Sequence, residues 1–234
     1  LYVVDSNNCR VRRCTPTGIV STFAGRGDLG YVGDGAAAVS AAFSEPTGIA
    51  LAPDQALYVA DTGNACIRSI SPDGTIRTAV GNGSRGRPMN GGHGPDTALY
   101  QPIGLCVNSS GKLFIADAAA NMVLSLSADG IVQIIAGTGL RGYAGDGGLA
   151  VEAQLDSPMG VVVSPDGSVF IVEFGNHCVR MIDTNGVITT VVGTGKSGFN
   201  GDGGLATEAE LANPRVSRSI IMIICTSPIA RTIG

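Results

Sequence analysis

The sequence predicts an all-β protein in which four-stranded antiparallel sheets stand side by side around a common axis. First, the chain repeats every 56 residues, with near copies of one strand-like segment starting at Leu1, Leu57, Leu113 and Val169. Second, each repeat consists of short β-forming runs separated by Pro, Gly, Asp and Asn. Third, two runs in each repeat are apolar on both sides, which is typical of sheets covered on both faces. A fixed period of this size with four strands per unit indicates the blades of a β-propeller.

Each repeat is expected to contain four strands in up-and-down order. In the second repeat they are expected at 47–52, 56–60, 66–70 and 75–80. Tight turns join the first strand to the second and the third to the fourth, and the other connections are longer loops. In a meander these two kinds of connection lie at opposite ends of the sheet. We expect function at the loop-rich end, at the mouth of the central channel, because long patterned loops are often functional.

The loops that link one repeat to the next carry a signature of their own. Each of Asp34, Asp146 and Asp202 is the central residue of a Gly-Asp-Gly sequence. A segment able to form one or two helical turns follows each of these sequences. An aromatic residue precedes this signature in three repeats and is expected to anchor packing: Tyr31, Tyr143 and Phe199.

Composition excludes several classes of protein. The 234 residues are 44% hydrophobic and 15% charged, with a formal net charge of −4, which is unlike a disordered chain. The 15 Lys and Arg form no basic stripe, so we expect no nucleic-acid binding. No apolar run reaches the ~18 residues of a membrane span, and no motif calls for a cofactor. The six cysteines show no pairing pattern and are either small buried residues or include a bridged pair.

These repeats resemble the NHL-repeat family of β-propellers. The resemblance rests on Pro-x-Gly before an apolar strand, on the Leu-Tyr-Val-Ala-Asp segment that starts at Leu57, on an apolar residue followed by Arg68 or Arg180, and on the Gly-Asp-Gly link. It covers about residues 1–214 and is similar to the long-linker type of the teneurin propeller. It implies a ring of six blades and a role as a binding scaffold. Leu124 stands where other repeats have Arg, so an Asp–Arg contact is not expected in the third blade.

Residues 1–215 are expected to form the propeller, and residues 216–234 to lie outside it. The apolar strand due after Pro214 is replaced by an Ile-rich stretch, which we interpret as a frameshift product. The chain should then hold strands two to four of one blade and three full blades, an incomplete part of a six-bladed ring. The alternative is closure as four blades. The exposed faces of an incomplete ring are apolar, so self-association is expected.

Polar residues recur where the second strand of each repeat ends. Asp61 and Glu173 close that strand, and Asn64 and Asn176 follow three positions later. They either close a turn in every blade or form a ring of carboxylates that attracts a cation or a basic partner. The same two interpretations apply to the aspartates of the links.

Two histidines do not recur and are of more interest. His93 and His177 are expected in loops of the loop-rich end, and His177 follows Glu173 closely enough to pair a base with an acid. The candidate binding residues on the loop-rich face are therefore Asp34, Asp61, Asn64, His93, Asp146, Glu173, Asn176, His177 and Asp202.

The sequence favours a non-catalytic scaffold that binds a protein, a peptide or a glycan through the loop-rich face. The alternative is a propeller enzyme of lyase or lactonase type with a metal at the channel mouth, which needs a cluster of ligands that is unique rather than repeated. Only Glu173, His177 and His93 qualify, so no catalytic residue or metal ligand is assigned. A purely structural spacer is a third hypothesis. Two tripeptides of the glycosylation type, at Asn82 and Asn108, slightly favour a secreted protein.

Overall fold

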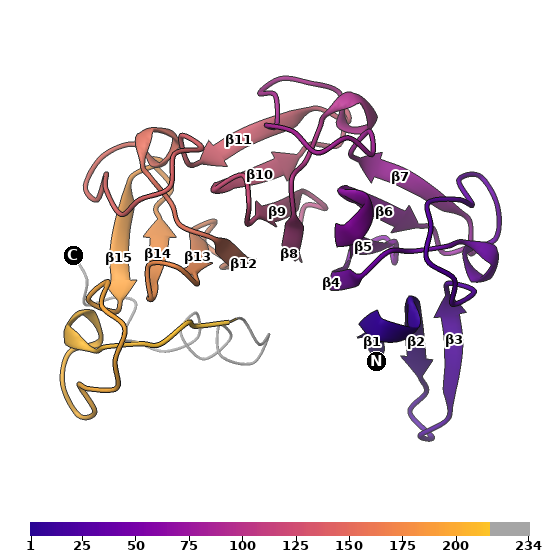
Figure 1. The fold of residues 1–234 in the computed structure, drawn as a ribbon, viewed down its shortest axis with the longest axis horizontal. Coiled ribbons are helices and arrows are strands. Elements are labelled where there is room, and N and C mark those ends of the chain that lie inside the picture. Colours follow the sequence, from indigo (N-terminus) through magenta and orange to yellow (C-terminus); the bar gives the residue numbers. More distant parts are fainter. Residues whose placement is uncertain (216–234) are drawn as a thin grey trace.

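The computed structural model describes residues 1–215, which form one three-stranded and three four-stranded antiparallel sheets, here called blades 1 to 4 (Figure 1). Blade 1 contains β1 (Tyr2–Asp5), β2 (Arg10–Cys14) and β3 (Val20–Ala24). Blade 2 contains β4 (Pro46–Leu51), β5 (Leu57–Asp61), β6 (Cys66–Ile70) and β7 (Ile76–Val80). Blade 3 contains β8 (Pro102–Val107), β9 (Leu113–Asp117), β10 (Met122–Leu126) and β11 (Val132–Ala136). Blade 4 contains β12 (Pro158–Val163), β13 (Val169–Glu173), β14 (Cys178–Ile182) and β15 (Ile188–Val192).

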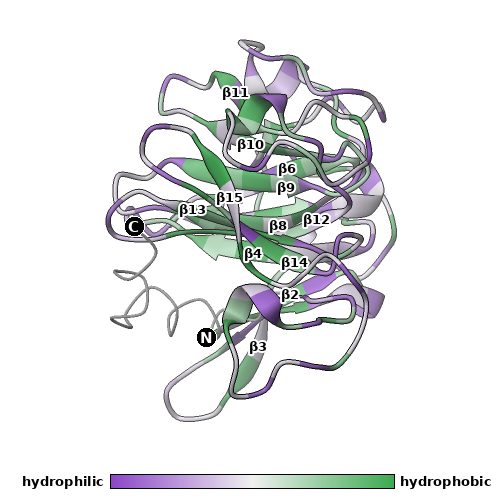
Figure 2. Ribbon diagram, turned by 90° about the vertical axis from the view of Figure 1, so that its left-hand side faces the viewer, coloured by the Kyte–Doolittle hydropathy of each residue, from purple (hydrophilic) through white to green (hydrophobic). Residues whose placement is uncertain are grey.

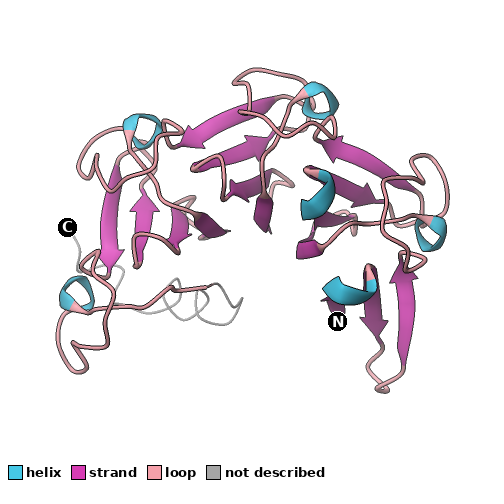
Figure 3. Cartoon of the chain, in the orientation of Figure 1, coloured by secondary structure: helices cyan, strands magenta, loops and turns pink. Residues whose placement is uncertain are grey.

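The predicted strands of the second repeat are confirmed to within one residue at each end. Strands pair only within their own blade, in sequence order, so that Leu57 of β5 faces Ile70 of β6 and Val59 faces Arg68. Within residues 1–215 the only helices are six single 3₁₀ turns (Figure 3). These are η1 (Ser6–Asn8), η2 (Ala38–Ser40), η3 (Thr62–Asn64), η4 (Gly94–Asp96), η5 (Ala150–Glu152) and η6 (Ala206–Glu208).

The blades are arranged radially, as the repeat predicts. The first strands, β4, β8 and β12, pack against one another at the inside, and the fourth strands, β7, β11 and β15, lie at the rim (Figure 1). The described residues form an open arc of blades rather than a closed ring (Figure 1). The predicted β-propeller of four-stranded blades is therefore confirmed.

The hydrophobic core lies between neighbouring blades. Three buried clusters fill the spaces between blades 1 and 2, 2 and 3, and 3 and 4. Between blades 1 and 2, Val11 and Ala24 meet Leu57 and Ile76 of the next blade, and Phe43 of the link completes the cluster. Apolar strands accordingly lie inside the molecule and polar loops outside (Figure 2). Each blade buries the apolar face of the next, which explains why the strands are apolar on both sides.

The links occupy a different place from the one predicted. The expectation put them at the channel mouth, but they run along the rim and bind the outer strand of the following blade. The Gly35 N–H donates to the Ile76 carbonyl, and the Ala38 N–H donates to the Gly74 carbonyl. Blade twist turns the outer strands along the rim (Figure 1), so a link that leaves one outer strand meets the next outer strand directly.

Cys9, Cys66 and Cys178 are buried and form no disulfide within residues 1–215; Cys66 and Cys178 occupy equivalent positions of their blades, and Cys9 lies one position earlier in blade 1. Among residues 1–215, no helix is long and apolar enough to cross a membrane. The predicted tail, residues 216–234, lies outside the described residues together with Cys225.

Candidate functional site

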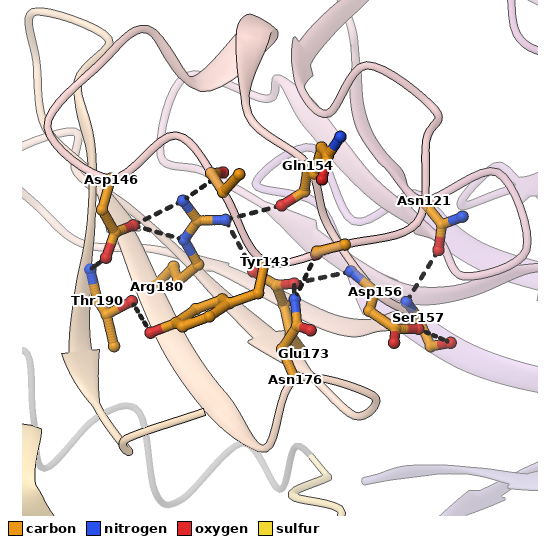
Figure 4. A network of polar contacts seen from close by, with 12 residues as sticks. Asn121, Tyr143, Asp146, Gln154, Asp156, Ser157, Glu173, Asn176, Arg180 and Thr190 are labelled. Carbon is orange, nitrogen blue, oxygen red and sulfur yellow. Dashed lines mark hydrogen bonds and ion pairs between the residues drawn. The ribbon is translucent and has the colours of Figure 1, made fainter. Parts of the chain in front are cut away.

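The most distinctive polar feature is a cluster around Arg180 of β14, which is fully buried (Figure 4). Its Nη2 lies 2.6 Å from Oδ1 of Asp146 in the preceding link, and its Nη1 lies 3.5 Å from Oε1 of Glu173 at the end of β13. Arg180 also donates to the carbonyls of Gln154 and Ala144, at 2.9 and 3.2 Å. One side chain thus joins a strand to two parts of the link.

Glu173 is fully buried and holds the turn between β13 and β14 against that link. Its Oε2 accepts the Asp156 N–H at 2.8 Å and the Asn176 side-chain amide at 2.6 Å. The same Asn176 amide nitrogen donates to the Gly142 carbonyl at 2.7 Å. Both carboxylate oxygens of Glu173 are therefore engaged within the blade.

The link aspartate also protects the outer strand. Oδ2 of Asp146 accepts the Thr190 N–H of β15 at 3.0 Å, and the Tyr143 hydroxyl lies 2.8 Å from the Thr190 hydroxyl. The guanidinium of Arg180 lies over the Tyr143 ring, 5.6 Å from its centre. An edge strand with unpaired N–H groups can pair with the strand of another chain. Here the Asp146 carboxylate accepts one of these N–H groups.

Blade 2 repeats the cluster 112 positions earlier in the sequence. Arg68 is fully buried, with Nη2 2.5 Å from Oδ1 of Asp34 and Nη1 3.6 Å from Oδ2 of Asp61. Asn64 donates to Asp61 at 2.8 Å, and Tyr31 lies beneath the guanidinium, 5.0 Å from its carbon to the ring centre. The aromatic residues before Gly-Asp-Gly thus pack as predicted in these two blades.

Blade 3 lacks the ion pair, as predicted from Leu124. Asn90 replaces the link aspartate but still accepts the Ile134 N–H of β11 at 2.8 Å. Among the described residues the buried Asp117 forms no ion pair with an arginine, and it accepts the N–H groups of Tyr100, Gln101 and Ala120 instead. A blade can therefore form without the buried arginine when backbone donors replace it.

Burial determines the electrostatics of these carboxyl groups. It raises the pKa of Glu173 to about 7, although the Asp156 N–H, Arg180 and Asn176 act in the opposite direction. It likewise raises the pKa of Asp61 to about 6 against the donors of Asn64 and Ser44 and the charge of Arg68. For the half-exposed Asp34 burial has the same sign, but Thr78 and Arg68 outweigh it and lower the pKa.

Shallow hollows recur on the rim beside these clusters. One, of about 550 Å³, is lined by Tyr31, Asp34 and Thr78 among others. A smaller one of about 330 Å³ has Arg87, Asn90 and other residues at the equivalent positions of the next blade. Their recurrence follows from the packing of each link on each outer strand.

The candidate residues predicted from the sequence are thus spread over two regions. Asp61, Asn64, Glu173 and Asn176 lie in and beside the turns that follow the second strands, whereas the link aspartates lie at the rim. The prediction that both histidines share the loop-rich end is wrong. His93 lies against Gly130 in the β10–β11 turn, and His177 belongs to the β13–β14 turn, where its Nδ1 accepts the Asn213 N–H at 3.0 Å.

The backbone explains the position of His177. Cys9, Ala65 and Asn121, at the equivalent positions of the other blades, share its left-handed conformation, with φ between 49° and 52°. Turn geometry therefore fixes this residue in every blade, whatever its side chain. Among the described residues, no group of three or more His, Cys, Asp or Glu is arranged to hold a metal ion.

Sequence reasoning missed a second set of residues, which are exposed and differ between blades. They lie in the first part of each link, in segments 25–30, 81–86, 137–142 and 193–198, here called the link loops. Equivalent positions hold Leu29, Arg85, Arg141 and Ser197. Leu29 is 71% exposed and the Arg141 side chain 75%. The sequence alone could have pointed to these residues, because they vary at equivalent positions of an otherwise regular repeat.

The link loops lie next to the turns after the second strands. Arg85 donates to the Gly63 carbonyl at 3.3 Å, and Asn64 donates to the Gly30 carbonyl at 2.7 Å. We call the link loops together with the turns 62–64, 118–121 and 174–177 the loop face. Recurrent buried groups hold this surface in place, and side chains that change from blade to blade cover it.

Radial four-stranded blades, each fastened to the link before it, define a β-propeller. Two family models match the chain: one described as NHL repeat over residues 43–68, and one described as Teneurin NHL domain over residues 139–200. The chain is a β-propeller built of NHL repeats, which confirms the resemblance seen in its sequence.

Curated relatives agree with this assignment. The chain is 29% identical to Protein SUPPRESSOR OF QUENCHING 1, chloroplastic, of Arabidopsis thaliana over 92% of this chain and 21% of that protein. It is 32% identical to Teneurin-m of Drosophila melanogaster over 71% of this chain and 6% of that protein. The chain thus spans about a fifth or less of the length of these relatives.

Among solved structures, an auxiliary nutrient binding protein from Bacteroides thetaiotaomicron has a similar fold. The TM-score is 0.62 at 16% identity, over 90% of this chain and 48% of that chain. This likeness supports the fold of the blades.

Proposed function

We propose that the chain is a non-catalytic binding scaffold that takes a protein, peptide or glycan ligand on its loop face. The observation that carries this proposal is that the buried polar groups and the exposed ones have different roles. The acids that end β5 and β13 are buried and paired with buried arginines inside blades 2 and 4, whereas exposed positions on the loop face differ from blade to blade. An enzyme of lyase or lactonase type needs a unique cluster of free polar groups, and no feature of the described residues favours one.

The composition of the loop face suits recognition of another molecule. Arg85 and Arg141 occupy equivalent positions of neighbouring links, and the apolar Leu29 and Leu140 are 71% and 64% exposed. Arginine is enriched in protein interfaces and is often among the few residues that carry most of the binding energy. Positive charge on a chain of net charge −4 also favours a ligand that carries an acidic group.

The proposal gives separate roles to the candidate residues found in the sequence. Asp61, Asn64, Glu173 and Asn176 position the turns of the loop face, and His177 contributes a partly exposed side chain to it. Asp34 and Asp146 hold the links on the rim. His93 and Asp202 lie outside the loop face and take no part in this binding site.

Selection with a displayed random-peptide library and a glycan array tests the proposal. A selected ligand should bind at least about tenfold more weakly to the double variant Arg85→Ala/Arg141→Ala, which corresponds to about 1.4 kcal/mol. Arg77→Ala, an exposed arginine on the rim, is the matched control and should bind normally. Failure to select any ligand, or a ligand equally sensitive to both variants, would contradict the proposal.

A further inference from the structure

Arg141 lies in the link loop between blades 3 and 4, where both its backbone and its side chain are fixed. The N–H of the next residue, Gly142, donates to the Leu155 carbonyl at 3.2 Å, and the Gly142 carbonyl accepts the Asn176 side-chain amide at 2.7 Å. The Arg141 Nε lies 2.8 Å from Oδ2 of Asp156. Because the Asp156 side chain is 7% exposed and the Arg141 side chain 75% exposed, a buried carboxylate holds a guanidinium that faces solvent.

The carboxylate that holds Arg141 is itself fixed and occurs once in the chain. Oδ1 of Asp156 accepts the Ser157 hydroxyl at 3.0 Å, and the Ser157 N–H donates to the Asn121 side chain at 3.0 Å (Figure 4). The equivalent positions of the other repeats hold no acid: Ser44, Tyr100 and Ala212. The ion pair between Arg141 and Asp156 is therefore not a part of the repeated architecture.

Arg85, the equivalent arginine one repeat earlier, is bound in a different way. Its Nη1 donates to the Tyr100 carbonyl at 2.5 Å, and its Nη2 donates to the Gly63 carbonyl at 3.3 Å. Both terminal nitrogens of Arg85 thus bond to the backbone of the propeller. Within residues 1–215, no hydrogen bond or ion pair joins Nη1 or Nη2 of Arg141 to another group. The terminal edge of the Arg141 guanidinium is open to a ligand.

The buried arginines of the chain show what such an edge can bind. Arg180 contacts Asp146 through Nε and Nη2, and it contacts Glu173 through Nη1. The buried arginine of blade 2 also contacts two carboxylates. A guanidinium can do this because it carries five N–H donors in one plane. Arg141 has one carboxylate, that of Asp156, at its Nε and has room for a second at its terminal nitrogens.

We propose that Arg141 binds a side-chain carboxylate of a peptide ligand through Nη1 and Nη2, while Asp156 holds Nε. Arg141 belongs to the loop face, so this inference rests on the proposed function and names the ligand class and the residue that selects it. Two parallel N–H···O bonds between arginine and a carboxylate are strong and fix the orientation of the ligand. Since Asp156 already orients the guanidinium, binding costs little side-chain entropy.

The neighbour of Arg141 favours a peptide over a glycan. Leu140 precedes it in the same link loop and is 64% exposed. A large apolar side chain next to the acid of a peptide can cover Leu140 and remove apolar surface from water, whereas a glycan rich in hydroxyl groups offers less apolar surface. The expected ligand is therefore a peptide with Asp or Glu beside a large apolar residue.

Selection of displayed random dodecapeptides on the 234-residue chain tests the inference. Selected peptides should contain Asp or Glu, and synthetic copies with Asn or Gln in its place should bind at least about tenfold more weakly. Arg141→Lys keeps a positive charge beside Asp156 but loses the planar fork, so it should weaken binding of the acidic peptides at least about fivefold. Arg85→Lys should weaken it less. Arg77→Lys, the same exchange on the rim, is the matched control and should bind like wild type.

The outcomes separate this inference from the proposed function. If neither the peptides nor a glycan array yields a ligand, the proposed function fails and the inference fails with it. If peptides are selected that lack an acid, or that bind Arg141→Lys as tightly as wild type, only the inference is overturned. Equal losses in Arg85→Lys and Arg141→Lys overturn it too, as does a glycan ligand where no acidic peptide is selected. Circular dichroism of Arg141→Lys should show the wild-type β signal.

Discussion

Nη2 of Arg180 lies 2.6 Å from the carboxylate of Asp146, although 34 positions separate the two residues in the sequence. The contact joins the third strand of blade 4 to the link that enters it. Because the guanidinium is fully buried and the carboxylate is 42% exposed, the ion pair connects the interior of the blade to the link at the rim. Removing Arg180 leaves the buried Glu173 carboxylate without its cation, and removing Asp146 takes one of two carboxylates from the buried guanidinium.

The first prediction concerns this buried arginine. Arg180→Leu should lower the free energy of unfolding by about 3–5 kcal/mol, because the buried Glu173 loses its cation. Arg141→Leu breaks an ion pair with Asp156 in which the arginine is 75% exposed, and should cost less than about 1 kcal/mol. Urea unfolding measures both changes. Similar losses in the two variants would show that burial of the arginine does not matter.

The second prediction is a pH dependence that originates at Glu173. Burial raises its pKa from 4.5 to about 7, so the folded state binds more protons than the unfolded state between these values. Stability from this group is complete below pH 4.5 and falls as the pH rises through 7. Urea unfolding at pH values across this window should show the decline, and Glu173→Gln should reduce it to the part that the raised pKa of Asp61 still causes. If the wild-type protein gained stability relative to Glu173→Gln as the pH rose from 4.5 to 7, the prediction would be contradicted.

The third prediction concerns two glycines that both have positive φ. A Cβ on Gly137 (φ +94°) would collide with the Asn121 carbonyl oxygen, whereas a Cβ on Gly147 (φ +81°) would meet nothing within 4 Å. Gly147→Ala should therefore cost about 1–2 kcal/mol from backbone strain alone. Gly137→Ala should cost at least about 2 kcal/mol more, because the start of the link must move. Thermal unfolding of both variants measures the difference, and equal melting temperatures would contradict it.

The fourth prediction concerns the order of the loop face. Asn176→Ala removes the amide that bonds to both Glu173 and Gly142, so the link loop 137–142 should open more often. Hydrogen exchange should quicken at the amides of this loop and stay unchanged in the link loop 81–86, which serves as an internal control. Unchanged exchange in both loops would mean that Asn176 does not position the loop face.

The strands and their grouping into blades could be predicted from the sequence because the information is local. Alternation, double-sided apolar runs and turn residues occur within each repeat, and the 56-residue period fixes what must be equivalent. The absence of an ion pair in blade 3 followed in the same way from Leu124 alone. Both predictions needed only the residue types at equivalent positions of the repeat.

The position of the links could not be predicted, because it depends on how far a blade twists from its first strand to its fourth. That twist turns the outer strands along the rim and moves Asp34 and Asp146 away from the channel mouth. His93 and His177 also lie in different regions, although sequence reasoning had put both at the loop-rich end. The recurrence of the acids did suggest a structural role, but their partners lie 34 residues away and follow only from the path of the chain.

A double-mutant cycle between Arg180 and Asp146 tests most directly whether the recurrent charged residues fasten links to blades. The free energies of unfolding of Arg180→Leu, Asp146→Asn and the double variant give the coupling between the two side chains. We predict a coupling of about 2 kcal/mol or more, with the double variant less destabilised than the sum of the single ones, since blade 3 folds with Leu124 and Asn90. Additive losses, with a coupling near zero, would show that the pair does not hold the blade together.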